Sequence, residues 1–196
     1  MGISPELTTQ WWRWALENPI NDNALLDQTG VNTSKEQNKD NFFLAGTIGD
    51  GPIHRKIEIG ADNNTKKLFF PVICVECSEL EFPFNVSDQL EKLQIATQEF
   101  IDGVTRMYAF IDGINYIHNA ERVKSDQFTI HFPENNIYRT VYNIVKVSEA
   151  RAYSDGFWLL VDSLTEGTHT IKFGGELITK DNFEFNTDVT YEITVI

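Results

Sequence analysis

Short runs of aromatic and β-branched residues, separated by turn-forming residues, constrain the fold of this chain more than any other feature. Residues 189–195 alternate apolar and polar side chains, and Asp112-Gly113 stands between two apolar runs as in a tight β-hairpin. Strands are expected at residues 42–48, 54–59, 68–75, 105–111, 114–117, 128–132, 138–147, 157–161, 169–173 and 189–195. The pattern predicts a mainly β fold, an antiparallel β-sandwich of the jelly-roll or immunoglobulin-like kind.

Two helices are expected beside these strands. The first begins after Ser4, a good N-cap, and ends before Pro19. The second covers residues 89–102, because a capping box begins at Asp88 and Gly103 follows as a C-cap residue. The sequence therefore predicts an N-terminal helix and one central helix added to the sheets.

The length of the chain suits one domain. Its 196 residues are enough to bury a full core, and neither an internal repeat nor a linker divides them. We expect a single β-rich domain over residues 1–196. Within it, residues 1–40 form the first helix and an irregular segment packed on the rest.

The net charge argues against some classes of partner. Lys and Arg total 16 against 29 Asp and Glu, which gives a formal charge of -13. Proteins bind nucleic acids and anionic membranes largely through Lys and Arg, so neither is an expected partner. No run approaches the ~20 apolar residues of a membrane span, and the first residues do not read as a signal peptide. The compartment and the oligomeric state stay open.

Several phrases of the sequence resemble an uncharacterised family of bacterial and archaeal proteins. They are Trp11-Trp12-Arg13-Trp14-Ala15-Leu16, Phe43-Leu44-Ala45-Gly46-Thr47, Phe69-Phe70-Pro71-Val72-Ile73, Asp155-Gly156-Phe157-Trp158-Leu159-Leu160 and the phrase from Gly167 to Gly175. The resemblance implies one domain and secreted relatives with a cysteine pair near positions 34 and 56, where this chain has Ser34 and Lys56. It implies no activity. The closing hairpin also resembles the last strands of immunoglobulin-like domains, which concerns the fold alone.

Motifs for catalysis are sparse. Cys74 and Cys77 form the only C-x-x-C, which lacks the second ligand pair of a structural zinc site and the βαβ setting of a redox motif. The histidines are scattered, and no G-x-S-x-G nucleophile elbow is present. We interpret the two thiols as free or bridged cysteines at the end of a strand.

Oxygen-rich loops suit calcium better than any other cation. The candidate ligands are Asp22, Asp27, Asp50 and Asp62. None of them belongs to a loop with the EF-hand pattern, and Asp and Asn are also ordinary turn formers. We rank turns ahead of calcium and expect no other cofactor.

Trp12 and Arg13 are the candidate ligand-binding residues. On a helix, Trp11 and Trp14 share one face, whereas Trp12 lies ~100° away. An exposed Trp12 could stack on a sugar ring or anchor a protein partner. A buried Trp12 would simply fix the helix to the sheet.

The leading functional hypothesis is a non-enzymatic binding or interaction module that recognises a glycan or a protein through an aromatic face. The aromatic content motivates it, with 14 Phe, 6 Tyr and 4 Trp. One alternative is a hydrolase whose site assembles from loop acids and histidines. Another is a structural or assembly subunit, which predicts a large apolar surface patch.

Overall fold

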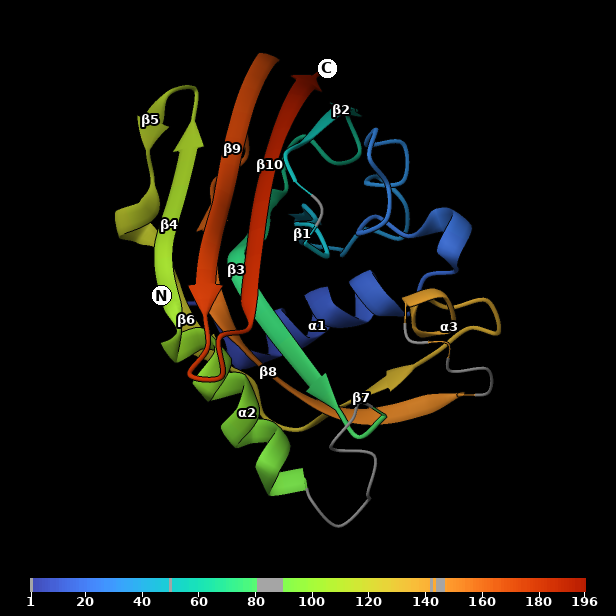
Figure 1. The fold of residues 1–196 in the computed structure, drawn as a ribbon. Coiled ribbons are helices and arrows are strands. Elements are labelled where there is room, and N and C mark those ends of the chain that lie inside the picture. Colours follow the sequence, from blue (N-terminus) through green and yellow to red (C-terminus); the bar gives the residue numbers. More distant parts are fainter. Residues whose placement is uncertain (1, 50, 81–89, 142, 144–146) are drawn as a thin grey trace.

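The structure, a computed structural model, describes residues 2–49, 51–80, 90–141, 143 and 147–196. These residues form two five-stranded sheets with helices around them (Figure 1). Sheet A has the order β1-β3-β8-β6, with β7 also paired to β8, and sheet B has the order β2-β10-β9-β4-β5. The strands are β1 (Asn41–Phe43), β2 (Ile53–Ile59), β3 (Lys67–Ser78), β4 (Val104–Ile111), β5 (Ile114–Asn115), β6 (Glu121–Lys124), β7 (Phe128–His131), β8 (Glu149–Val161), β9 (Gly167–Ile178) and β10 (Glu184–Val195). The helices are α1 (Pro5–Leu16), α2 (Leu90–Asp102) and α3 (Ile137–Val141), with short 3-10 helices η1 (Ile20–Asp22) and η2 (Ile117–Asn119).

The two sheets share an apolar core. The ring of Phe70 in β3 lies 4.7 Å from that of Phe173 in β9, and Phe173 stacks on Tyr191 of β10 at 6.2 Å. Further core residues include Leu68, Val72, Ala109, Ile111, Leu159, Ile171, Val189 and Ile193. The predicted mainly β architecture is confirmed.

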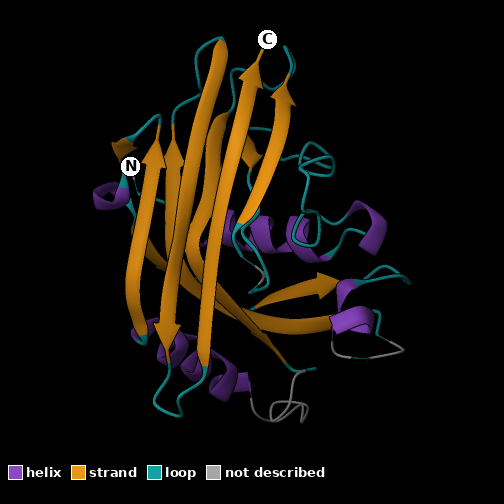
Figure 2. Ribbon diagram, turned by 45° about the horizontal axis from the view of Figure 1, so that its top comes forward, coloured by secondary structure: helices purple, strands orange, loops and turns teal. Residues whose placement is uncertain are grey.

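Helix α1 covers the other face of sheet A, as Figure 2 shows behind the long strands. Ser4 caps the helix, as predicted, by accepting a backbone N–H at 3.2 Å. Trp11 packs edge-on against Trp158 of β8 at 5.3 Å, and its Nε1 donates to the Leu44 carbonyl at 3.0 Å. β3 is therefore covered on both faces, which agrees with the long apolar run at residues 68–75. No helix in the described part of the chain is long and apolar enough to cross a membrane.

Three of the expected strands end early or do not form. The strand expected at residues 114–117 ends at Asn115, and the 3-10 helix η2 begins at Ile117. β1 ends at Phe43, so residues 44–48 leave the sheet instead of extending it. Where a strand was expected at residues 138–147, the chain forms helix α3, and residues 142 and 144–146 lie outside the described part. Asn136 explains the helix, because its side-chain oxygen accepts the Arg139 N–H at 3.1 Å as an N-cap does.

β8 is longer than expected because it runs through Asp155-Gly156. A Cβ at position 156 would lie 2.6 Å from the Cβ of Cys74 on β3, so glycine allows the two strands to approach. Asp155 is buried and receives hydrogen bonds from Arg122 of β6, a strand the sequence did not predict. β1 pairs with β3 and β2 pairs with β10 in parallel, so the antiparallel expectation fails for these two pairs.

Two predictions made from adjacent residues, the β4–β5 turn and the C-terminal end of α2, agree with the structure. Asp112 and Gly113 both adopt positive φ, 50° and 79°, which confirms the hairpin turn between β4 and β5. α2 ends before Gly103 as expected, and a Cβ there would come within 2.5 Å of the Ile178 carbonyl oxygen. The capping box predicted at Asp88 lies outside the described residues.

Candidate functional site

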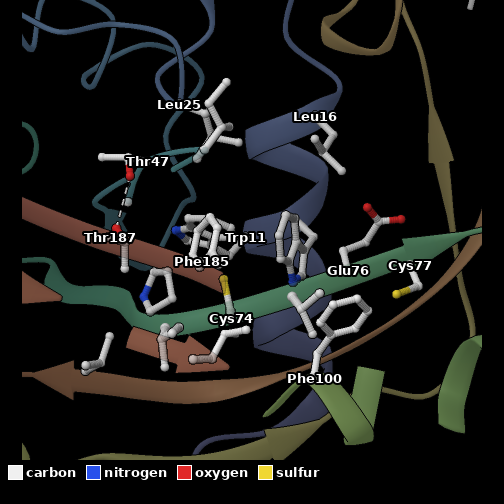
Figure 3. A pocket seen from close by; sticks show the side chains of 18 of the residues that line it. Trp11, Leu16, Leu25, Thr47, Cys74, Glu76, Cys77, Phe100, Phe185 and Thr187 are labelled. Atoms are coloured by element: carbon white, nitrogen blue, oxygen red, sulfur yellow. Dashed lines mark hydrogen bonds between the residues drawn. The ribbon is translucent and has the colours of Figure 1, made fainter. Parts of the chain in front are cut away.

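A partly open cavity of about 310 Å³ lies along β3. β1 pairs only with residues 67–69 of β3, so beyond Phe69 that edge of the strand has no neighbouring strand among the described residues. Helices α1, α2 and α3, the loop after β1 and the β9–β10 hairpin surround the space (Figure 3). Its walls include Trp11, Trp12, Leu16, Leu25, Gly46, Thr47, Ile48, Cys74, Glu76, Phe100, Ile137, Tyr138, Leu177, Phe183, Phe185 and Thr187.

Trp12, the ligand-binding candidate from the sequence, belongs to the wall of this cavity. Its side chain is only 8% exposed, so it offers no open face on the molecular surface. Its ring packs edge-on against Trp11 at 5.0 Å. The Trp11 N–H has a carbonyl acceptor, but the buried Trp12 Nε1–H has none among the described residues. A buried donor without an acceptor is costly, and this one belongs to a residue that lines an open space.

A β-bulge places polar side chains in the same cavity. The pairing of β3 with β8 shifts between Pro71 and Ile73. Phe69 and Cys74 are five residues apart and would face opposite sides of a regular strand, yet both contact the core under α1. The bulge therefore turns Cys74, and Glu76 two residues later, toward this side. Proline within the apolar run is the one sequence signal that could have indicated it.

Hydrogen-bonding groups lie at both ends of the cavity. At one end, the Tyr138 hydroxyl of α3 donates to the Glu76 carboxylate at 2.8 Å and lies 3.3 Å from the Ser78 hydroxyl. At the other end, the hydroxyls of Thr47 and Thr187 are 3.2 Å apart. Figure 3 shows Cys74 between these two ends. Glu76 is the only charged side chain among the described residues of the wall.

The Cys74 thiol is poorly suited to nucleophilic chemistry. Burial and the nearby Glu76 carboxylate raise the pKa of Cys74 well above its ordinary value. The thiolate is the nucleophile, so a thiol with a raised pKa is a weak one near neutral pH. Cys77 is buried, and the two cysteines are not bridged, which answers the question the sequence left open.

Apolar side chains surround the mouth of the cavity. Phe183 is 53% exposed and packs edge-on against Phe100 of α2 at 5.7 Å. It closes the β9–β10 turn, where Thr179 donates its N–H to the Phe183 carbonyl at 2.9 Å and accepts the Phe183 N–H on its hydroxyl at 3.0 Å. Ile48 is also exposed at the wall. The turn therefore holds a large aromatic side chain at the entrance.

Arg13, the second ligand-binding candidate, does not share a site with Trp12. Its Nε donates to the Thr129 carbonyl of β7 at 3.2 Å, and its Nη1 lies 3.7 Å from the Glu6 carboxylate. It lines a separate surface depression with Trp14. The helix that places Trp12 inward turns Arg13 toward that depression instead.

The candidate calcium ligands are not brought together. Asp22 pairs with Lys35. Asp27 accepts backbone N–H groups from Thr29, Gly30 and Asn32 at 2.8–2.9 Å; burial acts to raise the pKa of Asp27, but these hydrogen bonds lower it overall. Asp62 is exposed in a turn, and Asp50 lies outside the described residues. In the described ranges no group of three or more His, Cys, Asp or Glu side chains could hold a metal ion.

The histidines lie away from the cavity wall. His169 on β9 contacts Asp112 in the β4–β5 turn, with Nδ1 and Oδ2 2.7 Å apart, and its Nε2 lies 2.9 Å from the Thr165 carbonyl. His131 lies 3.8 Å from Glu149 across β7 and β8. Neither pair lines the space beside β3, so a hydrolytic site built from histidines and acids finds no geometric support there.

Comparison with known proteins adds no relative to this description. No family model, no curated protein and no solved structure matches the chain. The family resemblance noted in the sequence stays a prediction, and the chemistry of the cavity must carry the functional argument.

Proposed function

We propose that this chain is a non-enzymatic binding module whose ligand is a small, largely apolar molecule held in the cavity beside β3. The observation that carries the proposal is the combination of an aromatic wall with a buried Trp12 N–H that lacks an acceptor in the described part of the chain. The volume, about 310 Å³, falls at the lower end of ligand pockets. A β-sandwich of the jelly-roll or immunoglobulin-like kind is the fold we propose to carry this site.

The polar groups define what the ligand must offer. The Trp12 N–H calls for a hydrogen-bond acceptor, and the Glu76 carboxylate, which accepts the Tyr138 hydroxyl, places a negative charge at the wall. An anionic ligand would be repelled both by the Glu76 carboxylate and by the negative formal charge of the chain, -13. The ligand we propose therefore has an apolar body and a neutral or cationic polar end.

Binding is better supported than hydrolysis. A hydrolase needs an activated nucleophile or a pair of acid–base groups that converge on one point. The described wall contains one carboxylate, no histidine, and a cysteine whose raised pKa keeps it protonated. Exposed Phe183 at the mouth instead offers an apolar contact to a molecule that enters.

The test uses three probes that share one apolar body and differ in charge: indole, tryptamine and indole-3-acetate. Binding is measured by isothermal calorimetry and by the rise in melting temperature that a ligand of the folded state causes. We expect tryptamine and indole to bind more tightly than indole-3-acetate. Equal or tighter binding of the carboxylate, or no binding of any probe at millimolar concentration, contradicts the proposal.

Three variants locate the binding and test the charge preference. Gly46→Leu adds a side chain to the cavity wall, where a Cβ meets only the Thr187 hydroxyl at 3.6 Å, so it should block the space without straining the backbone. Gly60→Leu is the matched control, because a Cβ there has no neighbour within 4 Å and the position does not line the cavity. Glu76→Gln should reduce the preference for tryptamine over indole-3-acetate while leaving indole almost unaffected.

A further inference from the structure

A second groove, of about 540 Å³, crosses the face of sheet B that points away from the core. Tyr108 and Phe110 of β4, Lys172 and Glu176 of β9 and Asp188 of β10 contribute to it. Their neighbours in sequence, such as Ala109, Ile171 and Val189, point to the core between the sheets. The groove thus lies on the outer face of sheet B, although Leu177, Phe185 and Thr187 line both it and the cavity beside β3.

The central aromatic ring of this groove packs over a glycine. Tyr108, Gly174 and Asp188 lie opposite one another on three adjacent strands. A Cβ at position 174 would come within 2.5 Å of the Tyr108 hydroxyl oxygen and 2.8 Å of its Cζ. The ring therefore lies across the sheet over Gly174. The ring of Phe110 is 6.5 Å away and tilted by 33°, so the two rings form an aromatic platform.

Charged side chains of both signs flank the platform. Arg106 and Lys172 approach the Tyr108 ring centroid to 5.5 Å and 5.7 Å. Arg106 pairs with Glu176 at 3.0 Å, and Lys172 lies 3.8 Å from Asp188. Burial and the Asp188 carboxylate raise the pKa of Tyr108, so the phenol stays neutral over the working pH range. The groove offers donors and acceptors side by side around apolar rings.

This arrangement matches the chemistry of a neutral sugar. A pyranose ring has one face of C–H groups, which packs on an aromatic ring, and a rim of hydroxyls that both donate and accept hydrogen bonds. Covering a sheet glycine with an aromatic side chain also stabilises a sheet. That role explains the position of Tyr108 but does not require a groove lined by paired charges. A polyanion would be repelled by Glu176 and Asp188, and a purely apolar partner would bury the charged pairs without offering them hydrogen bonds.

We propose that the outer face of sheet B binds a neutral glycan, with one pyranose stacked on Tyr108 and its hydroxyls bonded to Arg106, Lys172, Glu176 and Asp188. The residues proposed to contact the sugar do not line the small-molecule cavity. The sequence suggested that a sugar could stack on Trp12, but Trp12 is buried. We place the stacking on Tyr108 of the sheet instead.

The experiment measures binding of soluble hexasaccharides by isothermal calorimetry. The panel contains β-1,4-, β-1,3- and α-1,4-linked glucose, β-1,4-linked mannose, β-1,4-linked xylose and β-1,4-linked N-acetylglucosamine, with hexagalacturonate as an anionic arm. We expect at least one neutral member to bind and hexagalacturonate to bind more weakly. If no neutral member binds, or if hexagalacturonate is preferred, the proposal is wrong.

Variants assign the binding to the platform. Tyr108→Ala should weaken the affinity at least about tenfold, since it removes the stacking surface, while Tyr108→Phe should retain it within a few-fold because the ring remains. Lys56→Ala, on β2 outside the groove, is the control and should bind as the parent does. Circular dichroism and melting temperature establish that each variant is folded. Unchanged binding by a folded Tyr108→Ala overturns the assignment, and Gly46→Leu should leave glycan binding intact whatever it does to the indole probes.

Discussion

Arg55 is the residue whose replacement should destabilise this chain most clearly. It lies on β2, is 1% exposed, and has no carboxylate within ion-pair distance among the described residues. Its Nε donates to the Asp27 carbonyl at 2.7 Å. Its Nη1 donates to the Ala45 carbonyl at 2.6 Å and to the Tyr191 hydroxyl at 2.7 Å. One side chain thereby ties the N-terminal segment and the loop after β1 to sheet B.

The magnitude follows from these contacts. Hydrogen bonds from a charged donor contribute about 1.5–3 kcal/mol each, and Arg55→Met loses three short ones and a longer one to the Leu25 carbonyl at 3.5 Å. Part of this loss is offset because a buried cation is no longer desolvated. Ala45 also stays bonded, since its carbonyl still accepts the Tyr191 hydroxyl at 2.9 Å. We therefore expect a net loss of about 3–5 kcal/mol, the range for removing one partner of a buried charged arrangement.

Urea unfolding followed by tryptophan fluorescence measures this loss directly. For a chain of this size it corresponds to a fall in melting temperature of roughly 6–20 °C. Lys56→Met is the matched control on the same strand, because Lys56 is 77% exposed and its pair with Glu192 at the surface contributes little. If the free energy of unfolding of Arg55→Met lies within about 1 kcal/mol of that of Lys56→Met, the reasoning is refuted, because the carbonyls would then be satisfied without the guanidinium. The Ala45 loop continues into the cavity wall, so the same variant should also weaken binding of the indole probes.

Three further outcomes are expected. Asp112 and a backbone carbonyl raise the pKa of His169. The pair of His169 and Asp112 therefore stabilises the fold below about pH 6.5, and this contribution is lost as the pH rises through the raised pKa. Between pH 6 and pH 8, the melting temperature of His169→Gln should accordingly change less than that of the parent. The raised pKa of Cys74 predicts slow modification by iodoacetamide in the folded chain and fast modification in urea, and equal rates at neutral pH would contradict it. Gly156→Ala should cost about 1–3 kcal/mol in urea unfolding because its Cβ would meet Cys74 at 2.6 Å, whereas Gly60→Ala, with open space, should not.

The features that the sequence predicts well are those set by neighbours along the chain. The Ser4 cap and the Asp112-Gly113 turn depend on a few adjacent residues, and the structure has both. The alternating run at residues 189–195 likewise forms the end of β10. Asn136 shows the limit of this reasoning, since its capping role was available in the sequence but the β-branched residues after it favoured a strand.

The cavity could not be predicted in the same way because it depends on one shift of register and on distant segments. The bulge after Pro71 decides which face of β3 carries Cys74 and Glu76, and alternation alone gives the wrong face. The remaining walls come from α1, from α2 and from the β9–β10 hairpin, whose positions follow from the packing of whole sheets. Sequence reasoning singled out Trp12 but left open whether it faces water or the interior.

The burial of Trp12 changes what the tryptophan cluster can do. Trp11 and Trp14 fill the space over sheet A, whereas Trp12 meets a volume that the described side chains leave open. Apolar walls around an open space forgo contacts they would make in a filled core, and residual cavities in cores cost about 24 cal/mol per Å³. A ligand that fills the space recovers those contacts only in the folded state, so it must raise stability in proportion to the logarithm of its concentration above Kd. The melting temperature of the chain therefore reports directly on any compound that fills this cavity.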